Sequence, residues 1–152
     1  MAQLHDTGEQ FNKKYIFTDE VSKPANLQVG LYSDSSDQLS DEDDIDDIQS
    51  EPDDGNYVRQ DVPFDDTGFQ AEQPGGAGTP WEANTTDDIV FDLEDTTGEV
   101  DYYFVVVEYE AEGDTGAQDH LYWTGELSQE YALDSLDQLT ILPDPGVGLD
   151  QD

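Results

Sequence analysis

The stretch 100-VDYYFVVVEYE-110 is the most hydrophobic part of this 152-residue chain. β-Branched and aromatic side chains dominate it, and these residue types favour strands. A run this apolar is incompatible with a solvated coil, so it predicts a folded domain with a hydrophobic core. We expect it to be the most deeply buried strand of that domain.

Shorter segments of strand character flank this stretch and are separated by turn signals. In one of them, Leu27, Val29 and Leu31 occupy alternate positions, as in a half-buried strand. Phe11 and Tyr15 lie four residues apart, which predicts a short helix over residues 8–18. Further strands are expected at 57–64, 88–94, 121–127 and 138–143, and Pro63 suggests a sheet edge. About seven or eight strands with one or two short helices predict an all-β fold, an antiparallel β-sandwich of jelly-roll-like form.

The length suits one domain with one core. We expect an N-terminal arm with a short helix over residues 1–24, a β-sandwich domain over 25–143 and a C-terminal tail over 144–152. Residues 65–87 are polar and Gly-rich, and we expect an excursion loop there, anchored by Phe69 and Trp81. Loops of this length are usually functional or ordered by a partner.

The charge of the chain is extreme. With 39 acidic and 4 basic residues, the formal net charge is 4 − 39 = −35. Such self-repulsion opposes a compact state at low salt, but at molar salt the Debye length falls to about 3 Å. Aromatic residues make up 11% of the chain, which argues against the alternative of an acidic disordered protein. The composition therefore predicts a folded protein adapted to molar salt, from a halophilic organism or one of its viruses.

The acids are densest in 31-LYSDSSDQLSDEDDIDDIQSEP-52, which contains no Lys or Arg. Metal binding, disorder and a solvated surface are the alternatives. An EF-hand loop starting at Asp34 fails, because Leu39 occupies the sixth position, where glycine is required. We predict one or two helical turns, opened by a capping box at Ser40 and Asp43 and held by Ile45 and Ile48, with carboxylates facing solvent. Na⁺, K⁺, Mg²⁺ or Ca²⁺ would bind there only adventitiously.

Candidates for chemistry are few. The chain has no cysteine, so disulfides and thiolate sites are excluded. His5 is expected in a mobile terminus and His120 at the surface. No nucleophile elbow, phosphate loop or zinc spacing occurs, and no pair of carboxylates stands out as a glycosidase pair. We therefore predict no enzymatic activity and no cofactor. We also predict no nucleic-acid partner and no membrane association, because so anionic a surface repels phosphates and anionic lipids.

Arg59 is one of only four cations and lies on a predicted strand among many acids. Its guanidinium can bind two carboxylates at once. We expect an intramolecular structural bridge, with a bridge between subunits as the alternative. Arg59, Phe69 and Trp81 are thus the candidate interaction residues.

The order of these motifs resembles a class of small structural proteins from tailed viruses, which includes capsid decoration proteins. The likeness covers roughly residues 25–142 and contains no catalytic signature. Asp101 departs from it, because that class usually has a small residue there. The residues that carry the likeness fall in two groups: Leu27, Val29, Gly30, Leu31 and Tyr32, then Ser50, Glu51, Gly55, Tyr57 and Arg59. The segments 97-TGEVDYYFVVVEY-109 and 121-LYWTGEL-127 resemble its later strands.

This resemblance implies an oligomeric virion component and, with the acidic composition, a tailed virus of halophilic archaea. We expect a capsid decoration (cement) or turret protein that binds and stabilises the assembled shell. Its partners would be the major capsid protein, other virion proteins and further copies of itself. The alternatives are a tail or fibre component, or a cellular sugar- or cation-binding β-sandwich module.

Overall fold

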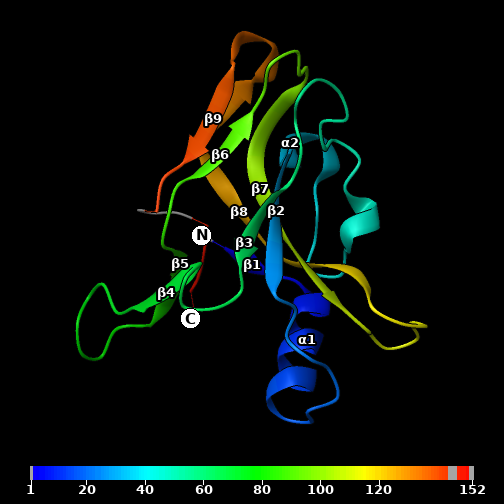
Figure 1. The fold of residues 1–152 in the computed structure, drawn as a ribbon, viewed down its shortest axis with the longest axis vertical. Helices are drawn as coiled ribbons and strands as arrows, with labels where there is room; N and C mark the ends of the chain where they lie inside the picture. The colour runs from blue at the N-terminus through cyan, green and yellow to red at the C-terminus, as the bar shows by residue number, and fades with distance from the viewer. Residues whose placement is uncertain (1, 144–146, 151–152) are drawn as a thin grey trace.

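In the computed structural model, which describes residues 2–143 and 147–150, the stretch quoted first forms strand β7 (Glu99–Tyr109). It lies at the centre of a five-stranded antiparallel sheet in the order β1-β8-β7-β2-β3 (Figure 1). The other four strands are β1 (Gln3–Leu4), β2 (Asn26–Tyr32), β3 (Gln60–Pro63) and β8 (Gln118–Ala132). β3 is an edge strand, as Pro63 predicted, because proline cannot donate a ladder hydrogen bond.

Two smaller antiparallel sheets complete the fold. One has the order β10-β5-β4, and the other pairs β6 with β9. The bounds of these strands are β4 (Phe69–Glu72), β5 (Glu82–Thr85), β6 (Ile89–Asp92), β9 (Gln138–Ile141) and β10 (Gly148–Asp150). Phe91 of β6 stacks on Tyr57 with ring centroids 5.9 Å apart and joins the main core. The predicted all-β antiparallel sandwich is confirmed.

Both faces of β7 are buried, which explains why its sequence shows no polar face. Val105 and Val107 belong to the main core, whereas Phe104 and Val106 belong to a second, smaller cluster. Three partly buried side chains of the acidic stretch pack against this second cluster: Leu39, Ile45 and Ile48. Residues 33–52 therefore form an acidic lid over the five-stranded sheet, anchored by apolar side chains as the two isoleucines predicted.

The N-terminal residues belong to the domain. Helix α1 (Asp6–Ile16) confirms the predicted helix, and β1 pairs with β8. Phe11 of α1 is buried between Tyr109 and Tyr122, with ring centroids 5.3 and 5.5 Å away. The expected arm over residues 1–24 is thus corrected, since its first half completes the sheet and closes one end of the core.

Two other boundaries also change. The expected excursion loop over residues 65–87 contains the β4–β5 hairpin, which extends to the left of the body in Figure 1. Within the expected tail over 144–152, β10 pairs with β5, while residues 144–146 and 151–152 lie outside the described part of the chain. The remaining elements are single turns: α2 (Asp34–Asp37), η1 (Ile45–Asp47) and η2 (Leu133–Ser135). No helix in the described residues is long and apolar enough to cross a membrane.

Candidate interaction surface

Carboxylates of the acidic lid accept hydrogen bonds from the backbone. Asp37 Oδ2 accepts from the N–H groups of Gln49 and Ser50, both at 3.1 Å, and from the Ser50 hydroxyl at 2.6 Å. Asp101 on β7 accepts from the Asp34 N–H at 2.7 Å, which fastens the lid to the sheet. An irregular segment leaves N–H groups without strand partners, and charged acceptors satisfy them strongly. Some acids of the stretch thus have structural partners, whereas Asp41, Glu42, Asp46 and Asp47 are exposed, as predicted for the carboxylates of residues 40–49.

The capping box lies four residues beyond its predicted place. Asp44 caps the short helix η1 by accepting from the Ile45 N–H, and Asp47 accepts from the Asp44 N–H at 2.9 Å. At the predicted box, Asp43 accepts from the Ser40 N–H at 2.7 Å, but no helix follows directly. So many acids in one stretch offer several equivalent caps, and the spacing alone does not choose among them.

His120 is held between two carboxylates. Its Nδ1 lies 2.6 Å from Asp44 Oδ2 and its Nε2 lies 2.6 Å from Asp114 Oδ2, and only the imidazolium can donate to both. Burial disfavours the charged ring, but the hydrogen bonds and charges of the two acids outweigh burial, so the pKa of His120 is raised. The expectation of a surface histidine is wrong, since His120 is buried. Asp44 also accepts from the Leu121 N–H at 2.7 Å, so this clamp fixes the lid to β8.

His5 is also buried, which corrects its expected place in a mobile terminus. The backbone N–H of His5 donates to the Tyr122 carbonyl at 3.0 Å, and the ring Nε2 lies 3.2 Å from Thr124 Oγ1. Burial lowers the pKa of His5, which opposes the direction seen at His120.

Arg59 makes the intramolecular bridge predicted for it. Its Nε and NH2 groups donate to the two carboxylate oxygens of Glu51, each at 2.9 Å. Asp119 lies farther away, at 4.0 Å from NH1, and the guanidinium carbon is 5.2 Å from the ring centroid of Phe104. Tyr57 donates to the same glutamate at 2.9 Å. Arg59 thus joins the end of the acidic lid to the sheet and is not a free contact residue.

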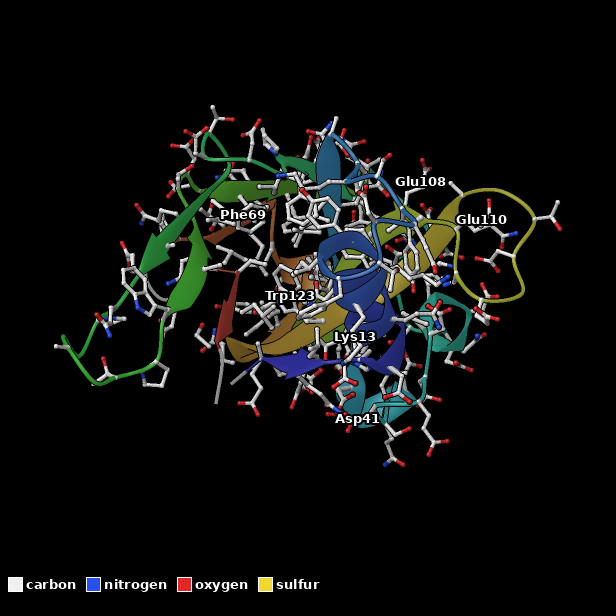
Figure 2. All side chains as sticks on the ribbon, turned by 90° about the horizontal axis from the view of Figure 1, so that it is seen from below. Lys13, Asp41, Phe69, Glu108, Glu110 and Trp123 are labelled. Carbon is white, nitrogen blue, oxygen red and sulfur yellow. The ribbon has the colours of Figure 1, made fainter. Side chains whose placement is uncertain are left out.

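Phe69 and Trp81, predicted as twin anchors, have different environments. Phe69 is partly buried and packs edge-on against Trp123, with ring centroids 6.3 Å apart (Figure 2). Trp81 precedes β5 in the hairpin and is 57% exposed. Phe69 therefore anchors the base of the hairpin to the core, and Trp81 is the candidate for contact with a partner.

A second apolar surface, at the end of α1, was not predicted. Ile16 and Phe17 are 64% and 80% exposed. Lys13, one turn earlier, is exposed and makes no ion pair or ring contact within the described residues, whereas Lys14 pairs with Glu20 at 2.9 Å. The signal was present in 12-NKKYIF-17, which combines two lysines with three apolar residues in a chain that has only four cations.

In the part of the chain that the structure describes, no group of three or more His, Asp or Glu side chains is placed to hold a metal ion. Oxygen-tipped side chains surround the molecule on all sides in Figure 2. No protein-family model, no curated protein and no solved structure matches this chain.

Proposed function

We propose that this chain is a non-enzymatic structural protein of a halophilic tailed virus. In this proposal it is a capsid decoration (cement) or turret protein that binds the assembled shell. The observation that carries the proposal is Trp81, a large aromatic side chain that is 57% exposed on a projecting hairpin. Tryptophan is enriched among the residues that dominate binding energy at interfaces, because it contributes a large area at low entropic cost.

The body behind the hairpin suits a static attachment role. Phe69 packs on Trp123 and on Phe64, at centroid distances of 6.3 and 6.4 Å, so the base of the hairpin is held against the core. A preorganised contact surface loses little conformational entropy on binding. A subunit that binds only the assembled shell then stabilises that shell by mass action.

The charge supports a role in molar salt. The acidic lid is fastened by carboxylates and the His120 clamp, so part of the −35 charge has a structural use. Most of the other acids among the described residues are exposed, and their repulsion requires screening by salt. This fits a particle that assembles and persists in brine, and it agrees with the order of motifs that resembles head-associated proteins of tailed viruses.

The test is co-sedimentation of the purified chain with virus particles in molar KCl, after mass spectrometry has established whether those particles contain it. Trp81→Ala should weaken attachment about tenfold or more, as expected for a central interface residue. Val58→Ala is the matched control, because Val58 is similarly exposed, at 62%, on another part of the surface. Circular dichroism should show both variants folded.

Each outcome discriminates between functions. Particles that lack the chain would refute the virion proposal, and undiminished binding of Trp81→Ala would refute the role of the hairpin. Labelling on the tail in electron micrographs would assign the chain to a tail or fibre instead. Saturable binding of a glycan or Ca²⁺ by a chain absent from particles would favour the cellular binding module.

A further inference from the structure

We propose that the exposed end of α1 in one copy of the chain docks into a groove beside β3 and β6 in a second copy. The contact would join two different surfaces of the same protein, head to tail. The contact uses neither Trp81 nor the hairpin tip, so this proposal can be tested independently of the proposed attachment to the shell.

The donor surface is the patch formed by Lys13, Ile16 and Phe17. Residues three and four apart on a helix lie on one side of it, so the lysine and the two apolar side chains are neighbours. Phe17 caps the helix and is 80% exposed, which leaves most of its ring in water. Helix α1 projects from the lower end of the body in Figure 1, so its end is accessible to another molecule. A partner for this patch must offer apolar atoms for Phe17 and a carboxylate for Lys13.

The acceptor surface is a groove of about 390 Å³ at the junction of β3, β6 and the base of the β4–β5 hairpin. Its apolar lining includes Val62 and Val90, the latter 41% exposed. The exposed carboxylates of Asp61, Asp87 and Asp88 also line it. It thus combines the two features that the end of α1 requires.

Charge selects a second copy as the occupant. Among the described residues, Lys13 is the one cation with neither an ion pair nor a ring contact, in a chain where acids greatly outnumber cations. The groove presents three carboxylates and no cation among its lining residues. Two copies repel each other at low salt, but at molar salt only contacts closer than about 3 Å keep their electrostatic strength. The association should therefore appear on addition of salt, when the repulsion between the two copies is screened and Lys13 of one copy can contact the groove of the other.

A head-to-tail contact of this kind closes into a ring or continues as a filament.

Sedimentation velocity of the purified chain in molar KCl tests this inference. The parent should self-associate with rising concentration, and Phe17→Ala should weaken association about tenfold or more. Lys13→Glu and Asp88→Lys should each weaken it, because each places like charges in contact. Mixing these two variants should restore association, since each then offers a surface complementary to the other.

Matched controls separate the contact from general charge effects. Asp134→Lys makes the same charge change as Asp88→Lys at an exposed site outside the groove, and it should associate like the parent. Trp81→Ala should also associate like the parent, even if it fails to bind particles. A parent that stays monomeric, an unaffected Phe17→Ala variant or a mixture that fails to associate would each overturn the proposal. If the parent is monomeric and floats with phosphatidylglycerol vesicles, the proposal is also overturned, and the α1 patch is assigned to lipid binding.

Discussion

Replacing Arg59 by alanine should destabilise the fold through the end of the acidic lid. Arg59 holds Glu51 with two hydrogen bonds of 2.9 Å, and Tyr57 donates a third to the same carboxylate. The Tyr57 hydroxyl in turn accepts from the Leu31 N–H at 2.9 Å. Removing the guanidinium leaves one hydroxyl to satisfy a partly buried carboxylate that now lacks its counter-charge.

The exposure of the pair determines the size of the effect. Breaking a fully buried ion pair costs about 3–5 kcal/mol, whereas an exposed pair contributes about 0.2–1 kcal/mol. The side chains of Arg59 and Glu51 are 27% and 22% exposed, so we expect an intermediate cost of about 2 kcal/mol. Loss of the contact with the Phe104 ring adds about 0.5 kcal/mol. Arg59→Lys should recover about half of this, because an ammonium cannot donate two parallel bonds.

Urea denaturation in molar KCl measures these changes. A double-mutant cycle with Glu51→Ala isolates the pair, and we expect a coupling free energy of about 1–2 kcal/mol. Glu51→Gln is the matched control, since it keeps the shape of the side chain and removes its charge. An Arg59→Ala variant within about 0.5 kcal/mol of the parent would refute the reasoning and reduce Arg59 to a surface charge.

Three further predictions concern salt, pH and packing. Circular dichroism should show cooperative folding in molar KCl and loss of structure at about 0.05 M salt, since a charge of −35 is then poorly screened, and an unchanged spectrum would refute salt adaptation. The pKa of His120 is raised, so its contribution to stability is complete below the unfolded value near 6.5 and is lost as pH rises through the folded pKa. The free energy of unfolding should therefore fall as pH rises above about 6.5 in the parent and fall less in His120→Gln, and equal slopes would contradict the clamp. Gly30→Ala places a Cβ 2.3 Å from the Phe104 ring and should cost about 2 kcal/mol in urea denaturation, and a cost below about 0.5 kcal/mol would contradict this close contact.

The candidate sites were predictable to different degrees. The bridge at Arg59 followed from the scarcity of cations, although the sequence did not identify Glu51 among the many acids. Trp81 and Phe69 look alike in a polar segment, and only the packing of Phe69 on Trp123 separates an anchor from an exposed ring. The groove beside β3 and β6 was not predictable, because it joins residues 60–63 to residues 85–90 across three sheets.

The errors at the histidines have a common cause. Both residues sit near strand ends in polar sequence, where exposure is the normal expectation. His5 is buried because β1 pairs with β8, and a two-residue strand has no periodicity that a sequence can reveal. His120 is buried because the acidic lid folds over β8 and brings Asp44 to it from 76 positions away.

By itself, the sequence determined the all-β class, the most deeply buried strand and the short helix near residues 8–18, because hydrophobic periodicity is a local property of the chain. Only the tertiary structure determined what the acids do. The apolar run in β7 implied cover on both faces, but the cover on one face is the most acidic part of the chain. Its carboxylates are structural because folding places them beside N–H groups and an imidazolium from distant segments, and such partners are set by three-dimensional proximity rather than by order in the sequence.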